Sequence, residues 1–309
     1  MAGRETVMPE VSVVVITLGR PGLYRMVDAI LEQETAFSFE VILVVNGAVD
    51  TGYFTDSRVR CFNEEPGRGF SYYRNRGVEL SSGRVIVFID DDEMPFDNNW
   101  LSLIAAPVLE GRTAATTGGA LVPMGHGALA DSISLLGFPG GGSLGWENVW
   151  PVDEEGYTWK LCTCNAAISR EVFEEIGGFE ESLVYGAEDV YLSEMLLERG
   201  SSTLFVGEAA VHHDPRGDLK GFVSWQVRRG RSVYDLRTLR RFRPGHVGGR
   251  MKRTWYIVRK SFPTRLFLPV LFILVLEHAC QLYGYALALH DAWRRGGMRP
   301  GGKGAGACN

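Results

Sequence analysis

Three short apolar segments in the first third of the chain alternate with segments of helical periodicity. Residues 11–17, 41–45 and 85–89 read VSVVVIT, VILVV and VIVFI and are rich in β-branched side chains. Such continuous apolar runs are typical of strands buried on both faces, as in a parallel sheet. Residues 23–33 carry apolar side chains at i, i+3, i+4 spacing, and residues 69–80 form a second candidate helix. This order predicts a doubly wound α/β fold, in which ligands bind at the carboxyl ends of the strands.

The middle of the chain has a mixed pattern after the third apolar segment. We expect helices there near 98–109, 170–176 and 188–199, and a strand near 114–122. Residues 125–150 are rich in glycine. We interpret them as a mobile loop over a site, with a surface insertion as the alternative.

Charge is distributed unevenly along the chain, whose net charge is -5. Residues 1–227 hold 15 Lys and Arg against 34 Asp and Glu, whereas residues 228–309 hold 17 against 3. The hydrophobic fraction of 45% excludes a mostly disordered protein. A basic carboxyl-terminal region on an acidic body predicts a contact with something anionic.

An apolar segment follows the basic one. Residues 266–289 are largely apolar and long enough to cross a membrane, but Glu277 lies near their centre, where a charge is costly. The preceding residues 228–265 contain 13 Lys and Arg, which anionic lipids attract. We therefore predict membrane attachment through 228–290, by a helix in the interface or by a span. A soluble helix packed on the body or on a second subunit, as in a homodimer, is the alternative.

The compartment is indicated by the cysteines and by the first residues. Five cysteines are irregularly spaced, with no CxxC pair and no zinc pattern, which favours free thiols in a reducing compartment. The opening MAGRETVMPE lacks the apolar run of a signal peptide. We expect a cytoplasmic protein held at the inner face of the cell membrane.

Three consecutive carboxylates follow the third predicted strand. Asp90, Asp91 and Asp92 directly succeed VIVFI and would repel one another without a cation among them. Hard oxygen ligands select Mg²⁺ or Mn²⁺, and such an ion would bind a diphosphate. From the triplet alone, a metal site and a solvated acidic turn remain equally good interpretations.

Further motifs follow in a fixed order: VSVVVITLGRP at 11–21, GRGFSYYRNRG at 67–77, TCNAAISREVFEEIGGF at 163–179 with GAED at 186–189, and VHHD at 211–214. Their order and spacing resemble the family-two glycosyltransferases over about residues 11–235. The resemblance implies an α/β GT-A fold, a Rossmann-like, mostly parallel sheet flanked by helices. It also implies an inverting, metal-dependent transferase that moves a sugar from a nucleoside-diphosphate sugar to an acceptor hydroxyl of a lipid-linked or growing glycan.

The chain divides accordingly into four expected parts. A flexible tail of 1–10 precedes a GT-A catalytic domain of 11–227. The basic helical, membrane-associating region is 228–290, and a flexible glycine-rich tail is 291–309. No nucleic-acid partner is expected.

The resemblance implies a role for each acidic residue and one histidine. Asp92, Asp90 and His213 match the ligands of Mn²⁺ or Mg²⁺. His213 is preferred to its neighbour His212. Asp189 matches the base that takes the proton of the acceptor hydroxyl, with Glu188 as the second catalytic carboxylate.

The resemblance also assigns donor and acceptor contacts. Donor binding is expected from Thr17, Arg20, Asn46, Asp50, Arg74, Asp90, Asp91, Arg228 and Arg229. Acceptor binding is expected from Trp159 and Asn165. One departure is Val45, where the family usually has an Asp that contacts the nucleotide base, so Asn46 or Asp50 is the expected substitute.

Three other functions compete with this interpretation. A polyprenyl-phosphate sugar synthase shares the donor chemistry but uses a lipid phosphate as acceptor. A non-catalytic nucleotide-sugar or glycan-binding protein would need no base such as Asp189. A phosphoryl-transfer domain would carry a GxxxxGK loop after the first strand, where this chain has TLGRPG.

Overall fold

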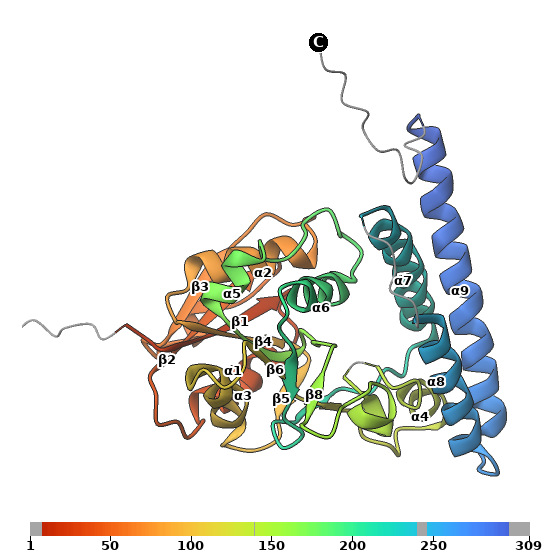
Figure 1. The fold of residues 1–309 in the computed structure, drawn as a ribbon, viewed down its shortest axis with the longest axis horizontal. Coiled ribbons are helices and arrows are strands. Elements are labelled where there is room, and N and C mark those ends of the chain that lie inside the picture. The colour runs from red at the N-terminus through yellow and green to blue at the C-terminus, as the bar shows by residue number, and fades with distance from the viewer. Residues whose placement is uncertain (1–7, 139, 240–245, 297–309) are drawn as a thin grey trace, which may run out of the picture.

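The structure is a computed structural model that describes residues 8–138, 140–239 and 246–296. An α/β body lies beside a layer of long carboxyl-terminal helices (Figure 1). The body contains an eight-stranded sheet in the order β3-β2-β1-β4-β9-β6-β10-β8. In that order the strands are Val59–Asn63, Phe39–Val45, Val11–Thr17, Val85–Asp90, Asn165–Ser169, Ala115–Thr117, Thr203–Phe205 and Tyr157–Thr158.

The three apolar segments become the parallel centre of this sheet. β1 pairs in parallel with both β2 and β4, and β2 pairs in parallel with β3. Consecutive side chains of β1 enter different cores, since Val13 and Val15 pack on one face and Val14 on the other. Burial on both faces explains why these strands carry no polar alternation. The sequence prediction of a mostly parallel sheet is confirmed, with β4–β9, β6–β9 and β8–β10 as its antiparallel pairs.

Helices cover both faces of the sheet. α1 (Leu23–Leu31) and α3 (Trp100–Leu109) bury their apolar sides against one face. α2 (Phe70–Leu80), α5 (Arg170–Glu175) and α6 (Glu188–Glu198) cover the other. This arrangement leaves the carboxyl ends of β1, β2 and β4 at one edge, where parallel strands place their ligands.

A small second sheet completes that edge. β5 (Glu93–Pro95) follows the acidic triplet directly, and β11 (Val211–His213) lies between it and β7 (Ala120–Leu121). The antiparallel register of β11 and β5 sets His213 opposite Glu93. Residues more than a hundred positions apart in sequence are thereby brought to one place.

The glycine-rich segment 125–150, interpreted from the sequence as a mobile loop over a site, contains three short helices in its described residues. It forms α4 (Ala128–Ser134), η2 (Gly142–Leu144) and η3 (Trp146–Asn148). Ile133, Leu136 and Leu144 join a third core with the carboxyl-terminal helices. Apolar residues scattered between the glycines therefore provide packing that their irregular spacing conceals.

Three helices form the carboxyl-terminal layer. α7 (Leu219–Leu239) lies next to the body, α8 (His246–Ser261) follows it, and α9 (Phe267–Arg294) forms the outer edge (Figure 1). α7 begins before residue 228, and α9 continues into the expected tail 291–309, whose residues 297–309 lie outside the described part. Within the described residues α9 is the one helix long and apolar enough to cross a membrane. The remaining short element is η1 (Thr51–Tyr53).

Candidate active site

The acidic triplet lies where β4 ends and is held by residues from β1 and its following loop. Asp90 is the last residue of β4. Thr17 Oγ1 donates to Asp91 Oδ2 at 2.7 Å, and Arg20 Nε lies 3.4 Å from Asp91 Oδ1. Burial raises the pKa of Asp91, although Thr17 and Arg20 oppose that shift. Asp91 is thus fixed by β1, and Thr17 acts through it.

Arg74 joins the triplet to the second acidic motif. It projects from α2 with only 5% of its side chain exposed. Its Nη2 donates to Asp90 Oδ1 at 2.7 Å, and its Nη1 donates to Glu188 Oε1 at 2.6 Å. Burial alone would lower the pKa of Arg74, but Asp90 and Glu188 outweigh it and raise that pKa. The planar guanidinium therefore makes one site of two motifs nearly a hundred residues apart in the chain.

Glu188 and Asp189 open α6 and face different partners. Burial raises the pKa of Glu188 despite its ion pair with Arg74. Asp189 keeps 27% of its side chain exposed, and its Oδ2 accepts from Lys160 Nζ at 2.7 Å. Ala187, just before them, has φ of 71° in the left-handed region, a conformation that costs free energy in a residue other than glycine. The pair therefore consists of a buried carboxylate and a solvent-accessible one.

Three residues at the end of the triplet away from Arg74 could hold a metal ion. One ligand atom each from Asp92, Glu93 and His213 lies within 4.8 Å of the others. His213 Nδ1 is 2.6 Å from the carbonyl oxygen of Asp214, to which it can donate its proton. Nε2 is then the acceptor nitrogen of the ring, and it faces Asp92 Oδ2 at 3.5 Å. Neither oxygen of Glu93 accepts from an N–H or O–H group of the described residues, although the side chain is buried. Two carboxylates and an oriented imidazole fit a Mn²⁺ or Mg²⁺ ion.

Two arginines surround this group with positive charge. Arg20 forms an ion pair with Asp92. Burial acts to raise the pKa of Asp92, but His213, Arg20 and Arg216 outweigh it and lower that pKa. Arg216 is half-buried, its guanidinium lies 4.6 Å from the centre of the Trp225 ring, and its buried Nε has no hydrogen-bond partner among the described residues. These cations would attract an anionic ligand to the edge of the sheet.

The loops after β1 and β2 lie against each other beside the triplet. A side chain at Gly19, where φ is 84°, would place its Cβ 2.0 Å from the Ala48 carbonyl oxygen. At Gly47 the Cβ would lie 2.1 Å from the Leu18 carbonyl oxygen. This close approach explains the glycines of the two motifs.

Asn46 and Asp50, the expected substitutes for a base-contacting Asp, lie on the second of these loops. Asn46 is half-buried directly after β2, and Asp50 is exposed. The Asp50 carboxylate already accepts from the backbone N–H of Gly52 at 3.0 Å.

Two expected site residues are used elsewhere. Asn165 is fully buried; its amide donates to the carbonyl oxygens of Gly119 and Ala209 and accepts from Trp100, so it holds the core together and cannot bind an acceptor. Arg229 stacks on Phe138 at 4.0 Å and faces the carboxyl-terminal helices rather than the triplet.

The remaining two expected residues stay accessible. Trp159 is half-buried, 5.9 Å from the ring of Trp150. Arg228 is exposed on α7 near Arg216.

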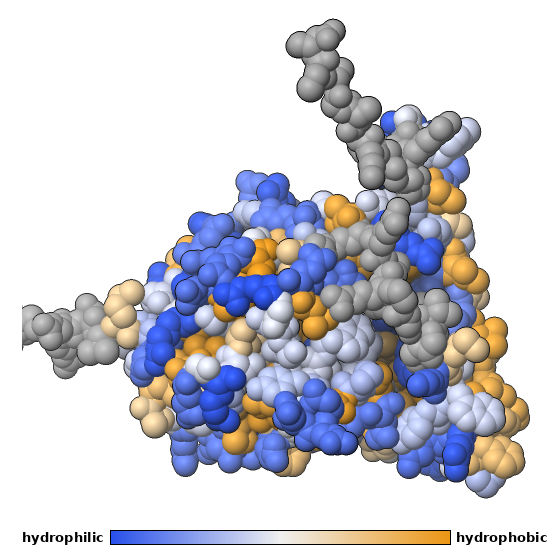
Figure 2. All heavy atoms as spheres, viewed as in Figure 1, coloured by the Kyte–Doolittle hydropathy of each residue, from blue (hydrophilic) through white to orange (hydrophobic). Residues whose placement is uncertain are grey.

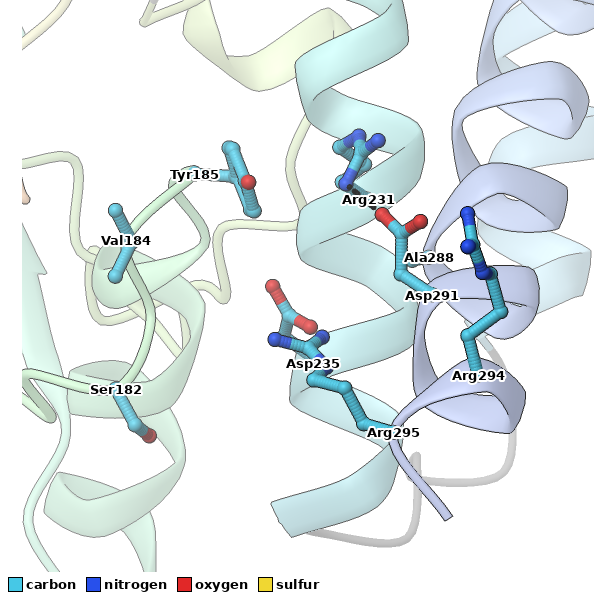
Figure 3. Close-up of a pocket in the computed structure, with 9 residues that line it drawn as sticks. All are labelled: Ser182, Val184, Tyr185, Arg231, Asp235, Ala288, Asp291, Arg294 and Arg295. Carbon is cyan, nitrogen blue, oxygen red and sulfur yellow. Dashed lines mark hydrogen bonds and ion pairs between the residues drawn. The ribbon is translucent and has the colours of Figure 1, made fainter. Parts of the chain in front are cut away.

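A cavity of about 490 Å³ separates the segment leading to Glu188 from the ends of α7 and α9. Val184 and Tyr185 line one side, and Arg231, Asp291 and Arg294 line the other (Figure 3). Arg231 Nη1 lies 2.9 Å from Asp291 Oδ2, and its guanidinium lies 5.3 Å from the Tyr185 ring. The segment that precedes Glu188 and Asp189 thus borders the carboxyl-terminal layer.

Sequence reasoning missed Lys160, Glu93 and Arg216. Glu93 extends the run of acids, a signal that was available. Lys160 and Arg216 are single basic residues in irregular segments, and only the folded chain shows that they lie beside Asp189 and Asp92.

Comparison with known proteins agrees with this geometry. Residues 12–177, more than half of the chain, match the family described as Glycosyl transferase family 2. The chain belongs to glycosyltransferase family 2. This membership agrees with the resemblance that the sequence motifs indicated.

Two curated relatives match this chain over only part of their own length. The O-antigen biosynthesis protein RfbC of Myxococcus xanthus is 26% identical over 67% of this chain, but only 17% of that protein is covered. The glucosyl-dolichyl phosphate glucuronosyltransferase of Haloferax volcanii is 28% identical over 55% of this chain and 56% of its own length. The chain thus spans about half or less of the relatives it matches.

A solved structure supports the fold. The mannosyltransferase PcManGT from Pyrobaculum calidifontis, in complex with GDP-Man and Mn²⁺, aligns with a TM-score of 0.55 and 18% identity. The alignment covers 95% of this chain and 77% of that one. At this identity the match establishes the GT-A fold alone.

Proposed function

We propose that this glycosyltransferase moves a sugar from a nucleoside-diphosphate sugar to an acceptor hydroxyl with inversion. The observation that carries the proposal is the bridge made by Arg74 between Asp90 and Glu188. The bridge joins Glu188, the residue before Asp189, to the triplet, which supports a site shared by the proposed base and the proposed diphosphate-binding edge. The accessible carboxylate of Asp189 takes the hydroxyl proton as the acceptor oxygen attacks the anomeric carbon, and the bond to the diphosphate breaks on the opposite face.

Asp92, Glu93 and His213 are the residues that would hold Mn²⁺ or Mg²⁺. Such an ion supplies Lewis acidity that neutralises charge developing on the leaving diphosphate. Arg216, whose buried Nε has no hydrogen-bond partner among the described residues, adds a positive charge for the same diphosphate. The Mn²⁺ and GDP-Man named with PcManGT support this assignment.

The acceptor is proposed to be a lipid-linked or growing glycan. The names of the relatives, which refer to O-antigen biosynthesis and to glucosyl-dolichyl phosphate, support an acceptor of this class. The basic carboxyl-terminal layer supports a place at the cytoplasmic face of the cell membrane, where such acceptors reside. A polyprenyl phosphate is the competing acceptor, and an assay that offers both substrates separates them.

The experiment replaces Asp189 by Asn, which is nearly isosteric but takes no proton. We expect donor binding to persist and transfer to fall about 10²–10⁴-fold. Donor affinity is measured by calorimetry with Mn²⁺ present, using nucleoside-diphosphate sugars in parallel, and transfer by product formation. Wild-type turnover in Asp189→Asn together with an inactive Glu188→Gln would assign the base to Glu188 instead.

A further inference from the structure

The outer side of α9 exposes apolar side chains along its whole length. The spacing of three and four residues keeps them on one face: Leu268, Phe272, Val275, Ala279, Leu282, Ala286, Leu289 and Trp293. We call these residues the outer face. In Figure 2 hydrophobic residues line the edge of the molecule along α9. A stripe of this size is larger than the scattered apolar residues of an ordinary soluble surface.

α8 and the turn that follows it extend this apolar surface with aromatic and basic residues. Met251, Trp255 and Phe262 are among the most exposed large apolar residues of the chain. They alternate with exposed basic residues, namely Lys252, Arg259, Lys260 and Arg265. Aromatic rings beside lysines and arginines are typical of a surface that contacts lipid head groups and the upper part of the acyl chains.

Two polar residues in the middle of α9, Glu277 and Gln281, turn inward. Glu277 is fully buried, and both its oxygens accept from Arg253 Nη2 of α8 at 2.9 Å. Gln281 Nε2 donates to Gln226 Oε1 of α7 at 2.8 Å. The acid that makes the sequence of α9 a poor membrane span is therefore satisfied inside the protein.

We infer that α8 and α9 form a one-sided contact with an anionic bilayer, in which the outer face enters the interface and α9 does not cross the membrane. This inference rests on the membrane attachment proposed above, but it does not depend on sugar transfer. It assigns the lipid contact to one face of one helix pair.

Packing against α7 excludes a span. At Gly284 a Cβ would lie 2.0 Å from the Val227 carbonyl oxygen, and at Gly230 it would lie 2.1 Å from the Gln281 carbonyl oxygen, so the two helices touch through their backbones. If α9 crossed the bilayer, either α7 would enter it with exposed charges such as Arg228, or α9 would separate and carry Glu277 into hydrocarbon. Both alternatives are costly.

The residues beside the outer face distinguish a bilayer from a second copy of the chain. A helix seam between two copies is normally flanked by charged residues that set partner and register. Among Asp, Glu, Lys and Arg, Glu277 is the one residue between 266 and 289, and it is buried. His278 beside it is half-buried, with Nδ1 2.7 Å from the Leu274 carbonyl oxygen. The flanks of the stripe are apolar or aromatic, including Leu271, Leu276 and Tyr283. A broad apolar surface edged by basic residues fits an anionic lipid surface better than a narrow seam.

The first experiment determines which side of the membrane each end of α9 occupies. Single cysteines at Arg265→Cys and Arg294→Cys are labelled with a membrane-impermeant maleimide in inside-out vesicles, with the unsubstituted chain as the reference for native thiols. We expect both positions to react equally with and without detergent. Protection of one position until detergent is added would show a span and overturn the inference.

The second experiment measures binding to vesicles of phosphatidylglycerol and phosphatidylcholine. Phe272→Ser and Leu282→Ser should each weaken binding about tenfold, because each removes an exposed apolar side chain that the lipid interface would bury. Phe96→Ser is the matched control, since Phe96 on the body is 55% exposed and Phe272 is 57% exposed. The control should bind like the unsubstituted chain.

Two results would overturn the inference here as well. One is unchanged vesicle binding in both outer-face variants. The other is a dimer in light scattering that Phe272→Ser dissociates, with no vesicle binding by the parent. Donor hydrolysis is measured in the same samples, so absent hydrolysis with normal binding counts against the proposed function and leaves the contact intact.

Discussion

Arg74 determines whether the acidic groups of the candidate site can coexist. Its guanidinium is almost completely buried between Asp90 and Glu188, each within 2.7 Å. Without it two carboxylates would be close together with little water to screen them. Arg74 of the motif YRN, which the resemblance assigned to donor binding, is thus the connection between two motifs.

Replacing Arg74 by Met should destabilise the fold by about 3–5 kcal/mol, the range for a buried ion pair that loses one partner. The measurement is urea unfolding. Arg76→Met on the same helix is the control, because Arg76 pairs with Glu64 and Glu79 at the surface and should change stability little. Equal losses in the two variants would contradict the buried bridge.

Asp92 is the carboxylate shared by His213, Arg20 and Arg216. We expect activity to require a divalent metal and Asp92→Ala to lower kcat about 10²–10³-fold, since charge on the leaving diphosphate would lose its stabilisation. Steady-state kinetics across a Mn²⁺ titration check this, with the exposed Asp97→Ala as the control. Full activity in excess chelator would contradict it.

At the scale of elements, Glu40 ties the beginning of β2 to its neighbours. Its carboxylate accepts from Ser12 of β1 at 2.8 Å, from Ser82 before β4 at 2.7 Å, and from Arg60 of β3 at 3.0 Å. Burial would raise the pKa of Glu40, but these hydrogen bonds outweigh it and lower that pKa. One side chain therefore joins the four parallel strands at the end opposite to the site.

The lowered pKa of Glu40 determines whether the stability of the fold rises or falls with pH. Because the unfolded chain binds the Glu40 proton more readily, this stabilisation is full above about pH 5 and is lost as pH falls toward 3. Glu40→Gln should cost about 1.5–3 kcal/mol at pH 7 and less at pH 3. Urea unfolding across this range tests it against the exposed Glu32→Gln. A constant difference at all pH values would exclude the assigned cause.

The crossing of α7 and α9 depends on the absence of a side chain at Gly284. Alanine there would favour the helix by about 1 kcal/mol, but its Cβ would overlap the Val227 carbonyl oxygen. We expect the overlap to dominate, with a net loss of about 1–3 kcal/mol in the free energy of unfolding. Ala286→Leu on the outer face adds more volume and should cost nothing. A stabilised Gly284→Ala would show that the helices are not in contact.

The elements that could be predicted are those with a local cause. β1, β2 and β4 have bounds close to those expected, because strands covered on both faces are apolar at every position. The segment 125–150 could not be predicted, since its packing partners on α8 and α9 lie far away in sequence. Asp189 could be found from the sequence because it lies in a motif. Lys160 could not, because it becomes the partner of Asp189 only in the folded chain. Asn165 was misassigned because a motif residue can serve the core.

For the whole molecule, the helical layer is continuous with the site rather than appended to it. β11 carries His213, Arg216 follows it and stacks on Trp225, and Trp225 already belongs to α7. Arg231 of the same helix reaches Tyr185, close to Asp189 in the chain. The division expected at residue 228 therefore falls inside one helix, and the helical layer is in direct contact with the segments that hold the ligands.

The bilayer contact proposed for the outer face of α9 would also determine how each proposed substrate reaches the protein. A protein held by one face keeps a fixed orientation to the plane of the lipids, with its rotation limited to the axis normal to that plane. The proposed water-soluble donor would then reach it by diffusion in three dimensions, and the proposed lipid-linked acceptor would reach it by lateral diffusion in two. The supply of the first substrate follows its amount per litre, and that of the second follows its number per unit area of a single leaflet.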